Sequence, residues 1–512
     1  MRHRTASLIF LALPLLAAVT AAGTPAPQDT IDRLVADRLR LLGVHPADLC
    51  SDEVFVRRIY LDAIGTLPTA DEAARFLADR SPAKRDALVD RLLARDEFAD
   101  YWAMKWCDLL RVKSEFPINL WPNAVQAYHR WLRTAIKENL PYDRFARELL
   151  TSSGSNFRVP QVNFYRAVQS KTPHALAAAA ALAFLGERAE HWPPERLNGL
   201  AACFSQVGYK GTAEWKEEIV YFDPAASNAQ MSAVMPDGTR VEFAPDQDPR
   251  AVFADWLTGP ARQRFARCHA NRVWAWLLGR GIVHEPDDFR PDNPPSNAEL
   301  LDFLARELVN ARFDVKRLYA AILKSKTYQR NCIPNTDSSL AERNFAFYPL
   351  RRLDAEVLID AINQVTGSGE KYTSNIPEPF SHIPEELRTI ALADGSVTSP
   401  FLTLFGRSPR ETGLFCERGS EPTAAQRLHL LNSSHIQRKL LEGRKLLATL
   451  RERGKNPREL TDTLFLAILS RYPTEAERSA VAAYRDKAED GRQVAIDVAW
   501  ALINTAEFQY RH

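Results

Sequence analysis

A proline-rich turn in the second half of the chain gathers three acidic side chains. The turn reads DDFRPDNPPSN over residues 287–297, and its acids are Asp287, Asp288 and Asp292. Clustered carboxylates could bind a hard cation such as calcium, although this spacing is not that of an EF-hand. The alternative is a structural turn in which the amides cap the next helix and Arg290 pairs with an acid. We favour the structural interpretation.

A second cluster of charges surrounds a single thiol in residues 406–423, GRSPRETGLFCERGSEPT. Cys416 would be reactive if nearby cations stabilised its thiolate, and Arg407, Arg410 and Arg418 could do so. The same arginines could instead form ion pairs with the glutamates of this segment. We favour the ion pairs, because structural networks are commoner than reactive thiols in such a pattern.

The two segments together define one candidate functional cluster. If the protein is a hydrolase, its site lies where the acidic turn approaches the thiol-bearing segment. A cleft with buried, paired carboxylates would favour the enzyme, and a flat apolar or aromatic patch would favour a binding surface. The catalytic roles stay unassigned. The candidate residues are Asn271, Arg272, Asp287, Asp288, Arg290, Arg410, Cys416, Glu417 and Arg418.

The sequence lacks the usual signatures of cofactor and metal binding. Covalent haem needs Cys-x-x-Cys-His, and the nearest run is Cys268-His269, which has Phe265 in place of the first cysteine. The eleven histidines show neither His-x-x-x-His nor His-Glu-x-x-His spacing. No nucleophile elbow, phosphate loop or dinucleotide fingerprint occurs. We therefore predict no cofactor and no metal.

The elements that must position the cluster are mostly helices. Apolar residues recur every three to four positions, as in 98–110, and Pro-Thr-x-x-Glu at 68–72 and 473–477 marks helix starts with capping boxes. The pattern changes to alternation at 218–222, and Pro-Asp-Gly within 231–243 predicts a β-hairpin. We predict a mainly α fold, with two helical domains and a small β-hairpin insertion between them.

The amino-terminal segment is typical of a secretory signal peptide. Arg2 and Arg4 precede the apolar run 8–19, which small residues follow. An uncleaved anchor is the alternative, and no later stretch of comparable length is free of charge, so no transmembrane segment is expected after cleavage. The predicted parts are a signal peptide at 1–22, a linker at 23–29, a helical domain at 30–224, a β element at 225–246 and a helical domain at 247–512. This organisation predicts a periplasmic or secreted protein.

The charge and the cysteines narrow the possible partners. The chain has 66 Lys and Arg against 64 Asp and Glu. Signal cleavage removes two arginines and no acid, which leaves no net charge and argues against nucleic acid. The six cysteines are far apart in the sequence. Export permits disulfides, but a large chain with a good core does not need them, so we favour buried free thiols.

Four segments resemble a two-domain family of exported planctomycete proteins, in which a cytochrome-associated domain of unknown function precedes a planctomycete-specific domain. They begin VRRIYLDAIG at residue 56, NRVWAWLLGR at residue 271, RRLDAEVLID at residue 351 and FGRSPRETGL at residue 405. These motifs are long and specific, and the resemblance runs from about residue 30 to the end of the chain.

The chain departs from the family at two cysteine motifs. The resemblance implies Cys-x-x-Cys-His between Phe-Leu-Gly and a following Trp, but only residues 187–191 lie between Gly186 and Trp192 here. The haem-attachment loop is therefore shortened, and His191 is interpreted as a possible relic. The family also has Cys-x-Cys before Glu-Arg, and Leu414 replaces the first of those thiols.

Three functions from different classes follow from these observations. We favour a noncatalytic binding or assembly component of the cell envelope, with an envelope protein or a polysaccharide as its partner. The first alternative is an envelope hydrolase that acts on polysaccharide. The second is an electron-transfer protein, which the missing haem motif argues against.

Overall fold

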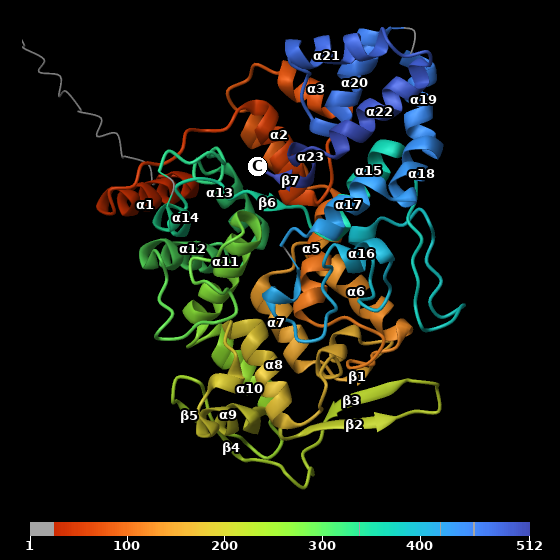
Figure 1. Cartoon of the computed structure of the whole chain (residues 1–512). Helices are drawn as coiled ribbons and strands as arrows, with labels where there is room; N and C mark the ends of the chain where they lie inside the picture. The colour runs from red at the N-terminus through yellow and green to blue at the C-terminus, as the bar shows by residue number, and fades with distance from the viewer. Residues whose placement is uncertain (1–24, 337, 420, 454–455) are drawn as a thin grey trace, which may run out of the picture.

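The computed structural model describes residues 25–336, 338–419, 421–453 and 456–512, and these are mainly helical (Figure 1). The predicted signal peptide at 1–22 lies outside the described residues. Helix α1 already begins at Pro27, so the end of the predicted linker is helical. The helices of the first half are α1 (Pro27–Leu41), α2 (Asp52–Ile64), α3 (Ala70–Ala78), α4 (Lys84–Leu93), α5 (Asp96–Leu109), α6 (Pro122–Lys137), α7 (Tyr142–Thr151), α8 (Pro173–Leu185) and α9 (Pro194–Ala201).

The second half continues the helical array. Its helices are α10 (Pro249–Thr258), α11 (Arg262–Leu278), α12 (Ala298–Asn310), α13 (Val315–Lys324), α14 (Ser339–Arg343), α15 (Ala355–Thr366), α16 (Pro400–Leu404), α17 (Ala424–Asn432), α18 (Ser434–Glu442), α19 (Arg444–Arg453), α20 (Pro457–Leu469), α21 (Glu475–Arg485), α22 (Gly491–Ile503) and α23 (Ala506–Gln509). Thr69 and Thr474 start α3 and α21 with complete capping boxes, which confirms both predicted helix starts.

The described strands form three small antiparallel sheets. The predicted hairpin is confirmed: β4 (Ser232–Val234) pairs with β5 (Arg240–Glu242), and Gly238 adopts a positive φ of 88° in the turn. A second sheet places β3 (Glu218–Phe222) between β1 (Gly154–Ser155) and β2 (Val207–Gly211). In the third, β6 (Arg351–Arg352) pairs with β7 (Tyr510–Arg511).

Helices from the two halves of the chain share one hydrophobic core. Helix α3 contacts α20, α4 contacts α13, α7 contacts α10, and α8 contacts α11. Figure 1 shows the red and orange start of the chain beside its blue end. The core cluster accordingly extends from Ile31 in α1 to Phe508 in α23. The two helical domains are therefore held together by burial of apolar surface that both supply.

Two buried arginines of α2 fasten the end of the chain to its beginning. Arg57 donates hydrogen bonds to the carbonyl oxygens of Ile468 and Phe508, at 2.8 and 2.7 Å. Arg58 donates to the carbonyl of His512 at 2.8 Å. Both guanidinium groups are fully covered. They thus satisfy backbone acceptors at the carboxyl-terminal segment, which a buried position requires.

No helix within the described ranges has the length and apolar character needed to cross a lipid bilayer.

Candidate functional site

The acidic turn and the thiol-bearing segment meet, as the sequence analysis expected. Asp287 is buried and accepts a hydrogen bond from the backbone N–H of Phe415 at 2.7 Å. Its other oxygen pairs with Nη2 of Arg272 at 3.1 Å, and only 2% of each of these two side chains is exposed. One carboxylate thus joins helix α11, the turn and the segment at 406–419.

Arg272 also fixes the turn that follows α8. Its guanidinium donates to the carbonyls of Leu182 and Ala183, at 3.0 and 2.9 Å. A cation at a helix carboxyl end is favourable because the unpaired carbonyls carry partial negative charge. Gly186 ends α8 with φ of 66°, and its carbonyl accepts from the N–H of Phe289 at 2.9 Å. The acidic turn is therefore seated directly against the end of α8.

A larger ion-pair network lies between the two domains, next to this contact. Arg410 and Arg418 approach the two oxygens of Asp108 in α5, at 2.9 and 2.6 Å. Arg418 also makes a bidentate contact with Glu356 in α15, at 2.8 and 3.0 Å. Arg407 lies 3.4 Å from Glu356. We call Asp108, Glu356, Arg407, Arg410 and Arg418 the interdomain network.

The backbone around Arg410 is built to bury this side chain. Arg410 has a positive φ of 56°, and its side chain is fully covered. A Cβ atom at Gly395 would lie 2.8 Å from Cδ of Arg410, so only glycine leaves the room that the aliphatic stem occupies. The guanidinium donates to the carbonyl of Ala393 at 2.7 Å as well as to Asp108. A loop of the second domain thereby closes on α5 of the first.

Two acids at the interdomain network, Glu356 and Asp354, are held ionised. Burial alone would raise the pKa of Glu356, but the charge and hydrogen bonds of Arg418, with Arg407, outweigh it and set the pKa at about 2. Burial would also raise the pKa of Asp354. The positive charges of Lys105 and Arg511 outweigh burial and hold this pKa well below its ordinary value. A glycosidase needs a carboxylic acid whose pKa is raised. These two carboxylates have the opposite property.

Four of the predicted residues lie beside the network but have local structural partners. The amide of Asn271 exchanges two hydrogen bonds with the backbone of Val283, both at 2.9 Å. Asp288 forms an ion pair with Arg290 at 2.9 Å. One oxygen of Glu417 accepts from the N–H groups of the preceding loop, at Glu411 and Thr412. These contacts agree with the structural interpretation of the turn and the loop.

The space left between these groups is small. A cavity of about 30 Å³ is lined by Lys105, Asp108, Leu109, Arg272, Trp276, Asp287, Ser408, Gly413, Leu414, Phe415 and Arg418. This volume has room for roughly two water molecules. A sugar ring does not fit, because the ion pairs and Phe415 occupy the space between the domains. Across the described ranges, no group of three or more His, Cys, Asp or Glu side chains is placed to hold a metal ion.

The turn after α8 does not fit a covalently attached haem. It supplies no thiol, and His191 is exposed at its outer end. The buried carboxylate of Glu187 fills the inside of the turn. It accepts from Nε1 of Trp192 at 3.0 Å and from Arg196 at 2.9 Å, and it pairs with Arg264. The ion pairs of Glu187 thus fill the turn, and the turn has no group that could attach a haem covalently.

The cysteines differ sharply in accessibility. All six are free thiols; Cys50, Cys107, Cys203 and Cys268 are buried, Cys332 is half-buried and Cys416 is exposed. The disulfides that export would permit are therefore not formed between them. Burial raises the pKa of Cys107 and Cys203 to about 12 and that of Cys268 to about 11.

We expect iodoacetamide at pH 8 to alkylate Cys416 at least about tenfold faster than any of the four buried thiols. The physical reason is access, since the reagent reaches the buried sulfurs only after local unfolding. Peptide mass spectrometry at timed intervals measures the rates, and the same reaction in guanidinium is the control, where all six should react alike. Rapid labelling of Cys107 in the folded protein would contradict this accessibility order.

Sequence reasoning missed the residues that the arginines pair with. Asp108 and Lys105 lie in an aromatic helix that reads as core, and Glu356 lies in an apolar one. The sequence did contain a signal for them, because each of these charged residues lies among apolar neighbours in its helix. Such a residue needs a buried partner of opposite charge.

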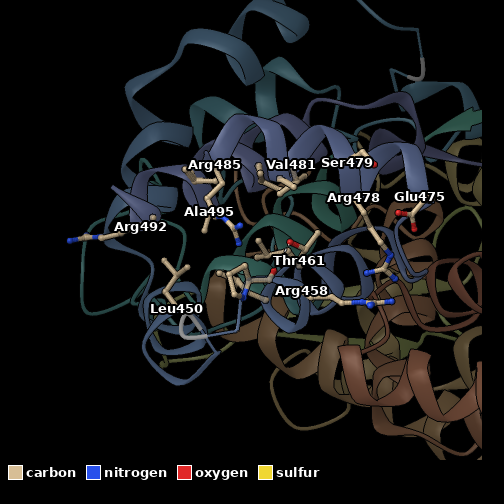
Figure 2. Close-up of a pocket in the computed structure, with 17 residues that line it drawn as sticks. Leu450, Arg458, Thr461, Glu475, Arg478, Ser479, Val481, Arg485, Arg492 and Ala495 are labelled. Atoms are coloured by element: carbon tan, nitrogen blue, oxygen red, sulfur yellow. Dashed lines mark hydrogen bonds between the residues drawn. The ribbon is translucent and has the colours of Figure 1, made fainter. Parts of the chain in front are cut away.

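Two hollows much larger than the cavity between the domains lie outside the predicted cluster. A groove of about 650 Å³ separates α21 from α20 and α22, beside α19 (Figure 2). Its apolar floor includes Leu460, Leu464, Val481, Val494 and Val498. No residue of α21 is fully buried, and Val481 packs against the core while only partly buried. The charged residues that line the groove are Arg458, Glu475, Arg478, Arg485 and Arg492.

The fold and the site define a mainly helical, two-domain protein whose domains are joined by a buried ion-pair network. Residues 30–189 match the PSCyt2 domain, a protein of unknown function (DUF1549), and residues 249–485 match the PSD1 domain, a protein of unknown function (DUF1553). The chain belongs to the family that carries these two domains in this order. No curated protein and no solved structure shows a significant match.

Proposed function

We propose that the protein is a noncatalytic binding component of the cell envelope, and that the groove between α19 and α22 receives an acidic, amphipathic helix of a partner protein. The observation that supports this proposal is a groove whose floor is apolar and whose rim is rich in arginine. Helix-in-groove recognition needs both a hydrophobic cleft and complementary charge at its edge. The same proposal includes the predicted signal peptide at 1–22, which would export the protein to the envelope, and the predicted domain boundaries at 30–224 and 247–512.

The rim gives the groove a positive character. Four of its lining residues are arginines and one is a glutamate. Figure 2 shows Arg492 at one end of the groove and Arg458 with Arg478 toward the other. Part of this charge is neutralised within the protein, because Arg478 pairs with Asp462 and Arg485 lies 3.4 Å from Asp486. The remaining excess favours a partner segment that carries acids beside its apolar face.

The ion pairs between the domains support binding over catalysis. A hydrolase that acts on envelope polysaccharide would need a cleft for sugar rings and a carboxyl group of raised pKa. The contact between the domains offers a cavity of about 30 Å³, and the carboxyl groups of Asp354 and Glu356 beside it have lowered pKa values. Electron transfer by haem would need ligands that the turn at Glu187 does not supply. A Soret absorbance in the purified protein would overturn that part of the proposal.

We expect Ala482→Trp to weaken capture of the partner strongly. Ala482 lines the groove and is exposed, so an indole there fills the hollow without disturbing the core. The neighbouring Ala483 is equally exposed on α21 but does not line the groove, which makes Ala483→Trp the matched control. The measurement is quantitative recovery of envelope proteins on the immobilised full-length protein, with about a tenfold loss expected for Ala482→Trp alone.

The identity of the captured segment completes this test. A photo-crosslinker placed at Ser479, which lines the groove, should label a peptide that is acidic and amphipathic. Equal recovery by Ala482→Trp and Ala483→Trp would refute the groove as the binding surface. Recovery of a polysaccharide that only Ala482→Trp loses would refute the helical partner while keeping the groove.

A further inference from the structure

Two histidines face each other in a second large hollow of the second domain. This hollow has a volume of about 710 Å³ and lies between helices α17 and α18, the loop at 367–371 and the segment at 385–386. His429 is in α17 and His435 is in α18, and the chain bends between these helices at Ser433. Both side chains line the hollow, so groups bound to their rings can exchange with solvent.

The two rings are held in place by fixed neighbours. Nε2 of His435 lies 3.0 Å from a carboxylate oxygen of Glu370. The ring of Phe401 packs edge-on against both imidazoles, with centroid distances of 5.7 Å to His429 and 6.0 Å to His435. Only 4% of the Glu370 side chain is exposed. Their positions are therefore set by packing as well as by hydrogen bonding.

The partners of Glu370 determine which nitrogen of His435 carries a hydrogen. Lys439 places its ammonium group 3.0 Å from the same carboxylate oxygen, so the carboxylate is an ionised acceptor. Nε2–H of His435 donates to it. The neutral ring then has its lone pair on Nδ1, the nitrogen that faces His429. A carboxylate that orients a histidine in this way is the usual outer partner of a metal-bound imidazole.

The separation of the two facing nitrogens matches joint coordination of one ion. Nε2 of His429 and Nδ1 of His435 are 3.3 Å apart. Two nitrogens bound at about 2.0–2.1 Å to a tetrahedral zinc ion stand about 3.3–3.4 Å apart. The observed distance therefore fits two nitrogens that share one ion, and it also allows a direct hydrogen bond between the rings when no ion is bound.

We propose that His429 and His435 bind a divalent transition ion such as Zn²⁺, with water completing the coordination from the hollow and Glu370 orienting His435. Imidazole nitrogens select zinc and related ions over calcium and magnesium. The two protein ligands leave open positions, so the bound ion is exchangeable and accessible to a small anionic ligand. The spacing of these histidines, across a break between helices, gives no sequence motif for such a site.

The test is calorimetric titration of the untagged, chelator-treated, full-length protein with Zn²⁺. We expect binding with one ion per chain and at least a tenfold loss of affinity in both His429→Gln and His435→Gln. Glu370→Gln should weaken binding by about 10–100-fold, as loss of an orienting carboxylate does. His382→Gln is the matched control, because His382 is a largely exposed histidine of the same domain. Circular dichroism confirms that each variant is folded.

Two results would overturn the zinc site. One is a wild-type protein that binds no Zn²⁺ up to millimolar concentration, which would leave the histidine pair as a hydrogen bond. The other is equal Zn²⁺ affinity in the wild type, His429→Gln and His435→Gln. Neither result bears on the groove at α21, because Ala482 and Ser479 lie on other elements.

Discussion

Replacing Arg418 by methionine should lower the free energy of unfolding by about 3–5 kcal/mol. Methionine keeps most of the length and apolar surface of the side chain but removes its charge. Asp108 and Glu356 then lose a partner that contacts them at 2.6–3.0 Å. Glu356 is completely buried and Asp108 is 13% exposed, so water cannot replace the lost interaction. Stability is lost because the carboxylates of Asp108 and Glu356 would then be largely shielded from water with less positive charge to compensate them.

The control for this prediction is an ion pair at the surface. Arg240 pairs with Glu242 at 3.2 Å, with 72% and 70% of these side chains exposed. Arg240→Met should change stability by no more than about 0.5 kcal/mol, because exposed pairs contribute little. Urea unfolding followed by circular dichroism measures both changes. Equal losses in Arg418→Met and Arg240→Met would show that the interdomain network does not stabilise the fold.

A double variant separates the interaction between Arg418 and Glu356 from the other consequences of removing the arginine side chain. In Arg418→Met/Glu356→Gln, one of the two stranded carboxylates is neutral. We expect this protein to be more stable than the sum of the two single changes predicts, by about 1–3 kcal/mol. Strict additivity would mean that Arg418 and Glu356 do not interact in solution.

Much of the fold could be predicted because its signals are local. The capping boxes at Thr69 and Thr474 lie within single turns of helix, and the hairpin depends on the turn at Gly238. Helix periodicity needs only neighbouring residues. The packing of α3 against α20 and the joint core of the two domains could not be predicted this way. Those contacts join segments hundreds of positions apart, and apolar faces fit many partners equally well.

The candidate site was predictable in its location and not in its character. The acidic turn and the thiol-bearing segment do meet, through Asp287 and the N–H of Phe415. The ion-pair partners of Arg410 and Arg418 could not be predicted from the sequence. They are Asp108 in α5 and Glu356 in α15. Without those partners, the arginines could equally surround a reactive thiol or a substrate. Because Asp108 and Glu356 are present, the charges are internal to the fold and Cys416 stays outside the network.

Glu356 makes the stability of the fold depend on pH. Its pKa is about 2 in the folded protein, against an ordinary value of 4.5, because Arg418 and Arg407 outweigh the effect of burial. A carboxyl group whose pKa is lowered by folding stabilises the protein above its unfolded pKa. That stabilisation is lost as the pH falls from about 4.5 toward 2. For Glu356 the contribution at pH 7 is on the order of 3 kcal/mol.

Glu356→Gln isolates this contribution, because glutamine resembles the protonated acid at every pH. We expect the difference in unfolding free energy between wild type and Glu356→Gln to narrow by about 2 kcal/mol between pH 7 and pH 3. Other carboxyl groups titrate in both proteins and cancel in the difference. Glu242→Gln, at an exposed position, should show a difference that stays nearly constant with pH. Urea unfolding at each pH gives these values. Parallel pH profiles for wild type and Glu356→Gln would mean that Arg418 does not lower the pKa of Glu356, and the ion-paired description of the domain interface would fail with it.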